Sequence, residues 1–178
     1  MKKVYLRAFE PDDYKTTITW RQDEETWSLL GSTRYFVSSE YEKKWIESAI
    51  FDPNNIKLAI CETVSNCHIG NVYLNNINKI HRTAEIGILI GNKEYRKRGY
   101  GTEAVAQIID YAFNELGLHR LQAVILESNA ASKRTFQKIG FSEEGLMRHT
   151  LYKNGAYQNQ LIMSILSSEY FNHPRSIS

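Results

Sequence analysis

The chain has 178 residues, of which 42% are hydrophobic and 24% are charged. Its 22 lysines and arginines nearly balance its 20 acidic residues, and a net charge of +2 argues against a general nucleic-acid-binding protein. No apolar run is long enough to span a membrane, and the first residues do not resemble a signal peptide. We therefore expect one cytoplasmic domain over residues 1–171, followed by a polar tail over residues 172–178.

The first half of the sequence predicts three helical segments and three strands. A proline and two acids at residues 11–13 favour a helix start, and a serine at 38 or 39 favours another, with Glu42 as its candidate capping-box partner. Helices are expected at residues 10–20, 24–30 and from 39 towards the turn at 52–55, and strands at 4–9, 57–62 and 68–75. Cys61 and Cys67 match no metal spacing and are expected to be reduced thiols, although a cross-strand disulfide between them stays open.

A fourth strand at residues 83–90 leads into the most informative stretch, the basic turn Tyr95-Arg96-Lys97-Arg98-Gly99-Tyr100-Gly101-Thr102. The near-continuous apolar character of that strand predicts burial on both faces in the middle of a sheet. Two glycines spaced by one residue let the backbone approach a ligand closely, and the first turn of the next helix offers unpaired N–H groups to an anion. We interpret this turn as a pyrophosphate site, although a solvated basic turn would have a similar composition.

The second half contains the clearest helical patterns. Apolar residues recur at three- and four-residue intervals from Gly101 to Leu116, and Gly117 ends that helix. Residues 120–126 predict a fifth strand, after which Asn129 caps a helix over residues 130–139 that Gly140 stops. Two last strands are expected at residues 141–150 and 158–166, around a turn at residues 153–155.

Two segments carry a resemblance to a known family. Arg96-x-x-Gly99-x-Gly101 resembles the acetyl-CoA signature of the GNAT N-acetyltransferase superfamily, and residues 127–141 resemble that family's second motif. The resemblance covers nearly the whole chain. It implies an α+β (α/β) GNAT fold with a mixed central sheet of about six to seven strands and helices on both faces. The ending, with Arg148 and Asn159, resembles the RimJ/RimL-type branch, and Asn159 with residues 80–85 is similar to the spermidine N-acetyltransferases.

The resemblance implies acetyl-CoA as co-substrate, no metal, and direct attack of a primary amine on the thioester. The implied cofactor-binding residues are Leu89, Ile90, Arg96, Arg98, Gly99, Tyr100, Gly101, Thr102, Asn129, Ser132, Lys133 and Phe136. A strand N–H near Leu89 or Ile90 would act on the thioester carbonyl like an oxyanion hole. Asn129 is also consistent with a plain helix cap.

Glu85 is the candidate catalytic base. An alkylamine has a pKa near ~10.4, so it arrives charged and must lose a proton before it can attack. Strand periodicity places Glu85 on the same face as Gly87 and Leu89. Small and apolar neighbours favour a role in accepting that proton. A substrate-binding or surface carboxylate is the open alternative.

Phe136 raises the alternative of an acyl-CoA-binding module without catalysis, since many relatives have a tyrosine there that protonates the leaving thiolate. We nevertheless expect an enzyme, because a thiol pKa near ~8.5 makes the thiolate a tolerable leaving group. A polyamine, a protein N-terminus or an amino sugar could supply the amine, with Glu24, Glu25 and Glu40 as candidate contacts of a polyamine. No nucleic-acid or membrane partner is expected, and a homodimer or larger homo-oligomer is the expected assembly.

Overall fold

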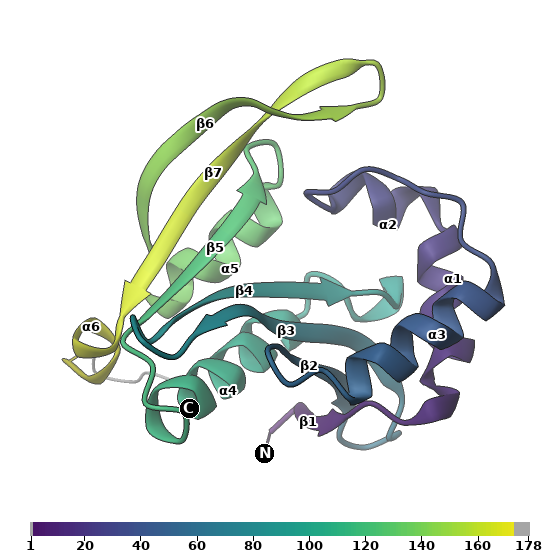
Figure 1. Ribbon diagram of the computed structural model, residues 1–178, viewed down its shortest axis with the longest axis horizontal. Coiled ribbons are helices and arrows are strands. Elements are labelled where there is room, and N and C mark those ends of the chain that lie inside the picture. Colours follow the sequence, from purple (N-terminus) through teal and green to yellow (C-terminus); the bar gives the residue numbers. More distant parts are fainter. Residues whose placement is uncertain (1, 173–178) are drawn as a thin grey trace.

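A computed structural model describes residues 2–172, and its core is one seven-stranded sheet in the order β1-β2-β3-β4-β5-β7-β6 (Figure 1). The strands are β1 (Val4–Ala8), β2 (Ile56–Glu62), β3 (His68–Asn78), β4 (Thr83–Ile90), β5 (Arg120–Leu126), β6 (Ser142–Lys153) and β7 (Ala156–Leu166). The helices are α1 (Tyr14–Gln22), α2 (Glu24–Leu29), α3 (Ser39–Ile50), α4 (Tyr100–Asn114), α5 (Ala130–Ile139) and α6 (Ser167–Asn172), with 3-10 turns η1 (Pro11–Asp13) and η2 (Lys93–Tyr95). Only β4 and β5 pair in parallel, which confirms the expected mixed sheet.

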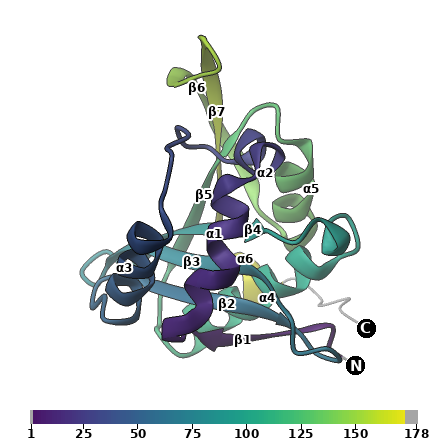
Figure 2. The same cartoon turned by 90° about the vertical axis from the view of Figure 1, so that its right-hand side faces the viewer.

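Helices cover both faces of the sheet, as expected (Figure 2). On one face, α4 and α5 pack a large core against β3, β4 and β5, with Ile108 and Phe136 among its buried side chains. On the other face, a smaller cluster joins α3 to β1 and β2 through Ile46, Ala59 and Cys61. Strand periodicity separates the two cores, because successive side chains of each strand point to opposite faces.

The parallel pairing of β4 with β5 is short. It joins residues 83–85 of β4 to residues 120–122 of β5, after which the two strands diverge in a V (Figure 1). The prediction that β4 is buried on both faces is therefore wrong for its second half. Ala84 and Ile86 are buried, whereas residues 87–90 are only half-buried because no strand covers the edge of β4 beyond the pairing.

Several element boundaries differ from expectation for identifiable reasons. Ser38 is the N-cap of α3 and its hydroxyl accepts a hydrogen bond from Tyr41 N at 3.1 Å. Glu42 does not complete a capping box, because it is fully buried and pairs with Arg21 of α1 at 3.2 Å. β3 continues to Asn78, and α6 was not expected at all. The rest of the predicted tail, residues 173–178, lies outside the described residues.

The β6–β7 hairpin arches over the open side of the V and its tip approaches α2 (Figure 1). At that tip the ammonium of Lys153 donates hydrogen bonds to the main-chain carbonyls of Trp27 and, at 2.6 Å, Leu30. The last carbonyls of a helix lack intrahelical donors, and the helix dipole favours a cation there. Burial lowers the pKa of Lys153. This contact ties the hairpin to the end of α2.

The packing beside the V can be tested at Gly91, which directly follows β4 and lies against Trp20. A Cβ atom built there would lie 1.9 Å from Cδ2 of Trp20, whose indole is buried. We expect Gly91→Ala to lower the free energy of unfolding by about 1–3 kcal/mol through overpacking, measured by chemical denaturation. Gly145→Ala is the matched control, since a Cβ there meets open space. Equal stability of the two variants would contradict this packing.

Candidate active site

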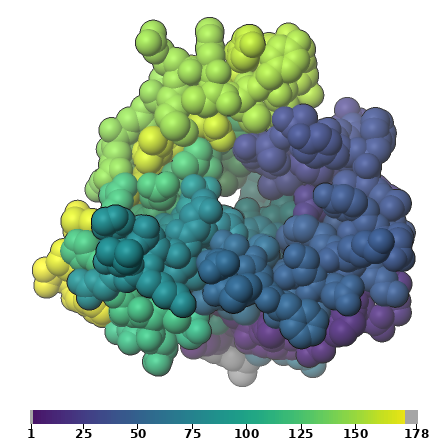
Figure 3. Space-filling view, viewed as in Figure 1, coloured from purple at the N-terminus to yellow at the C-terminus, as the bar shows by residue number. Residues whose placement is uncertain are grey.

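A cavity of about 410 Å³ opens where β4 and β5 part, and the space-filling view shows the molecule hollowed between these strands and the N-terminal helices (Figure 3). β3 and β4 supply Tyr73 and Leu89 to its wall, and β5 and α5 supply residues 124–126 and Phe136. Residues 29–32, which comprise the last residue of α2 and the segment after it, close it from above. Segments far apart in the sequence thus form one chamber beside the end of β4.

The basic turn lies at that same end of β4. Gly99 has a φ of 88° and stands at the N-cap of α4, in the left-handed conformation that favours glycine. Because Gly99 has no side chain, no side-chain cap covers the first turn of α4, and the N–H groups of Tyr100, Gly101 and Thr102 have no intrahelical acceptor. These amides and the positive end of the helix dipole are suited to a phosphate group.

The two arginines of the turn behave differently. The Arg98 side chain is exposed, with one hydrogen bond to the carbonyl of Glu94 at 3.2 Å, and its guanidinium lies 5.8 Å from the ring centre of Tyr100. It can move towards an anion at little cost. Arg96 instead uses four of its five N–H donors within the protein, on the oxygens of Ile90, Gly91, Thr26 and Glu25.

Two predicted phosphate contacts, Arg96 and Lys133, have other partners in this structure and stay predictions. The guanidinium of Arg96 clamps α2 to the end of β4 rather than reaching into the turn. Lys133 on α5 forms an ion pair with Glu143 at 2.7 Å and faces β6. Their charge and their place in the motif favour phosphate binding. Neighbouring acids and carbonyls, which the motif does not include, occupy four of the five N–H donors of Arg96 and pair with the ammonium of Lys133.

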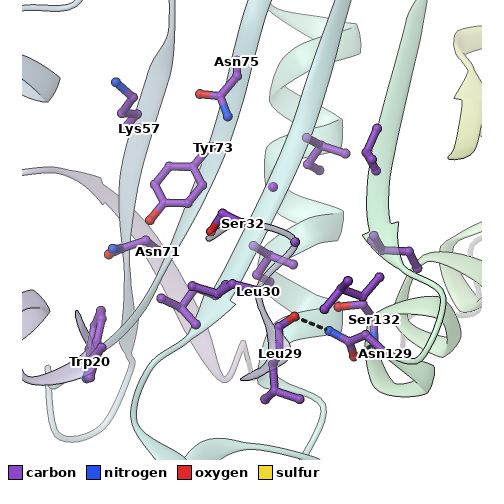
Figure 4. A pocket seen from close by; sticks show the side chains of 18 of the residues that line it. Trp20, Leu29, Leu30, Ser32, Lys57, Asn71, Tyr73, Asn75, Asn129 and Ser132 are labelled. Carbon is purple, nitrogen blue, oxygen red and sulfur yellow. Dashed lines mark hydrogen bonds between the residues drawn. The ribbon is translucent and has the colours of Figure 1, made fainter. Parts of the chain in front are cut away.

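Asn129 and Ser132 do line the cavity (Figure 4). Phe136 also belongs to its wall. The Asn129 side chain caps α5 by accepting from Ser132 N at 3.0 Å, and its amide nitrogen donates to the carbonyl of Leu29 at 2.9 Å. It is thus both a helix cap and a link to the segment above the cavity. Phe136 is 1% exposed and its ring centre lies 4.9 Å from that of Phe141.

The carboxylates named from the sequence are not in the cavity wall. Glu85 shares a face of β4 with Gly87 and Leu89 as expected, but it sits where β4 still pairs with β5 and does not line the cavity. Glu25 pairs with Lys93 and Arg96, Glu24 pairs with Arg34, and Glu40 is exposed on α3. The carboxylate that does line the cavity is Glu42.

Sequence reasoning missed most of the polar wall. Asn71, Tyr73 and Asn75 alternate along β3 and face the cavity beside β4 (Figure 4). Burial raises the pKa of Tyr73 to about 12, so its hydroxyl stays protonated at neutral pH. The alternating polar side chains of β3, the strand that pairs with β4, were the signal that could have identified these residues.

The sequence also raised expectations about the cysteines, a metal site and a membrane span. Cys61 is buried and Cys67 exposed, both are free thiols, and neither lines the cavity. Within residues 2–172, no cluster of three or more potential metal-ligating side chains occurs. In the same range, no helix has the length and apolar character needed to cross a membrane.

Comparison with known proteins agrees with this geometry. A model of the acetyltransferase (GNAT) domain matches residues 3–142. The spermidine N(1)-acetyltransferase of Escherichia coli K12 is 32% identical over 170 residues, which cover 94% of this chain and 88% of the relative. The corresponding Vibrio cholerae enzyme is 36% identical over 170 residues, which cover 96% of each chain.

A solved structure extends the match to the fold. The spermidine N-acetyltransferase from Vibrio cholerae in complex with CoA and spermine superposes with a TM-score of 0.88 at 27% identity, over 97% of this chain and 100% of that chain. These relatives are named as enzymes, which favours catalysis over an acyl-CoA-binding module. Since the family model spans most of the sequence and the relatives nearly all of it, the chain belongs to the GNAT family and is an acetyl-CoA-dependent N-acetyltransferase.

Proposed function

We propose that this enzyme acetylates a polyamine, with acetyl-CoA lying across the parted edge of β4. The observation that carries the cofactor site is the cavity between β4 and β5 beside the uncapped first turn of α4. The pyrophosphate binds the N–H groups of Tyr100, Gly101 and Thr102, with Arg98 closing over it. The pantetheine arm follows β4, and Asn129, Ser132 and Phe136 contact it from α5.

In this arrangement the reaction is a direct transfer. A main-chain N–H on the open edge of β4, near Leu89 or Ile90, donates to the thioester carbonyl and stabilises the charge that develops on its oxygen. The amine nitrogen, once deprotonated, attacks the carbonyl carbon, and the carbon–sulfur bond then breaks. CoA leaves as a thiolate and takes up a proton. Phe136 has no proton to give, so water or another hydroxyl supplies it.

The polyamine proposal is supported by the named activity of the relatives from Escherichia coli and Vibrio cholerae. A second candidate is an amine that also carries an anionic group, since Arg21 and Lys57 both line the cavity. Lys57 pairs with Asp52 at 3.0 Å, whereas Arg21 uses its Nε on Glu42 and its terminal nitrogens have no acceptor among the described residues. The RimJ/RimL-type branch, a cytoplasmic location, homo-oligomer formation and Glu85 as base remain predictions.

Alanine substitutions of Arg98 and Arg96 can be compared to test the cofactor site. We expect Arg98→Ala to weaken acetyl-CoA binding roughly tenfold, because one charge-assisted hydrogen bond to phosphate is lost, and to leave the free energy of unfolding unchanged. Arg96→Ala should instead destabilise the fold, because Arg96 holds Ile90 and Thr26 together. Calorimetric titration and chemical denaturation measure the two effects. The assignment fails if the two variants show the reverse pattern.

Phe136→Tyr tests how the leaving thiolate is protonated. We expect unchanged affinity for acetyl-CoA and a kcat that stays level or rises, because general acid help is worth roughly 10²–10⁴-fold only where it limits the rate. Steady-state release of free CoA thiol in the presence of a saturating amine gives kcat. A wild-type protein that acetylates no amine, alongside an active Phe136→Tyr variant, would mean that the native chain only binds acyl-CoA.

A panel of amines separates the two substrate candidates. If a polyamine is the substrate, kcat/KM for spermidine should exceed that for a simple alkylamine such as propylamine. A higher kcat/KM for a phosphorylated or carboxylated alkylamine would instead favour recognition by Arg21. Equal rates for all three would show that neither candidate is recognised. The same thiol-release measurement applies, at fixed saturating acetyl-CoA.

A further inference from the structure

Two buried oxygen atoms in the cavity wall have no hydrogen-bond partner among the described residues. They are Oγ1 of Thr17 on α1 and Oε1 of Glu42 on α3. Thr17 is 2% exposed and Glu42 is fully buried. Buried polar groups in folded proteins are nearly always paired, and an unpaired charged group is the most costly exception. Their shared location suggests that a hydrogen-bond donor from a ligand satisfies them.

The Glu42 carboxylate is held in a fixed orientation. Its Oε2 accepts a hydrogen bond from Nε of Arg21 at 3.2 Å. The Arg21 guanidinium lies 4.9 Å from the ring centre of Trp45 and 5.8 Å from that of Trp27, so aromatic rings fix its position. With Oε2 occupied, Oε1 is the atom left to accept another donor. Thr17 precedes Arg21 by one helical turn and therefore shares its face of α1.

The charged groups around Glu42 do not prevent its Oε1 from binding a further cation. Lys57, the other cation in the cavity wall, is paired with Asp52 at 3.0 Å and lies over Trp45. Tyr73 carries no charge at physiological pH, as is usual for a tyrosine, and burial, together with the nearby charge of Glu42, raises its pKa to about 12. Within residues 2–172, Arg21 is the one ion-pair partner of Glu42, while carboxylates readily accept charge-assisted hydrogen bonds from two cations.

We propose that Glu42 Oε1, together with Thr17 Oγ1, binds a primary ammonium group of the acceptor substrate. An ammonium carries three N–H donors, which can satisfy both oxygens at once. The site makes Glu42 a specificity-determining residue: it selects cationic amines at the end of the cavity formed by α1 and α3. This inference rests on the proposed function, and it supplies the acidic contact that Glu24, Glu25 and Glu40 do not provide within the cavity.

The test is Glu42→Gln in the full chain, which keeps the size of the side chain and an oxygen for Arg21 but removes the charge. For the best amine of the panel, we expect KM to rise roughly 10- to 100-fold, as for the loss of a hydrogen bond between charged groups. Affinity for acetyl-CoA should stay within about twofold. Glu47→Gln is the matched control, since it makes the same charge change at an exposed position of α3. An unchanged KM in Glu42→Gln overturns the proposal.

Hydroxylamine, a nucleophile that is neutral at assay pH, separates recognition from structure. If Glu42 binds the ammonium, Glu42→Gln should keep the wild-type rate with hydroxylamine while losing affinity for the charged amine. An equal loss for both nucleophiles would mean that Glu42 only holds α1 against α3, and the proposal would fall.

Thr17→Val, which keeps shape and removes the hydroxyl, should raise the amine KM several-fold and replaces Glu42→Gln if that variant does not fold. A wild-type protein without activity on any amine would instead refute the proposed function.

Discussion

The parallel pairing between β4 and β5 ends after residues 83–85 and 120–122, and the rest of the active-site region depends on that early end. Beyond it, no strand of residues 2–172 pairs with the edge of β4 that faces β5, while the other edge stays paired with β3. The main-chain groups on the open edge are available to a ligand, except the Ile90 carbonyl, which accepts a hydrogen bond from Arg96. A buried, unpaired strand edge would be costly, whereas an edge that lines a cavity is solvated or bound. β5 retains its full pairing with β7, which keeps the second arm of the V rigid.

Three side chains hold the segment around α2 in place over the cavity. Arg96 binds Thr26 of α2, Lys153 binds the carbonyls at the end of α2, and Asn129 binds the carbonyl of Leu29. These anchors come from the basic turn, the β6–β7 hairpin and the start of α5. Since α2 has only six residues, its position cannot come from helix propensity and depends on these contacts.

Some charged side chains around the site have partners within the protein, whereas others can contact a ligand. Arg96 and Lys133 have acidic partners within the protein. Arg98 has a hydrogen bond to the carbonyl of Glu94 and is otherwise exposed, and the first amides of α4 have no intrahelical acceptor. In the cavity wall, Nε of Arg21 binds one oxygen of Glu42, and the other oxygen of Glu42 has no hydrogen-bond partner among the described residues. Charge alone therefore does not identify a ligand contact. The number of unsatisfied donors and acceptors is the better guide, because each buried one carries a free-energy cost.

The sequence by itself determined the order of the strands and of the helices up to α5, and it singled out the basic turn as the predicted cofactor site. Periodicity located β4, β5 and α5 to the residue, and Asn129 and Gly140 located the two ends of α5, because these signals depend on local backbone geometry. The helix expected to end at Leu116 before Gly117 ends at Asn114. The tertiary structure decided which side chains meet in the cavity. Glu42 was expected at a helix cap and lies buried against Arg21, and Arg96 was expected on phosphate and binds α2. A side chain's partner depends on elements distant in sequence, so no local pattern could have shown that Thr17 of α1 and Glu42 of α3 lie in the same cavity wall as β3.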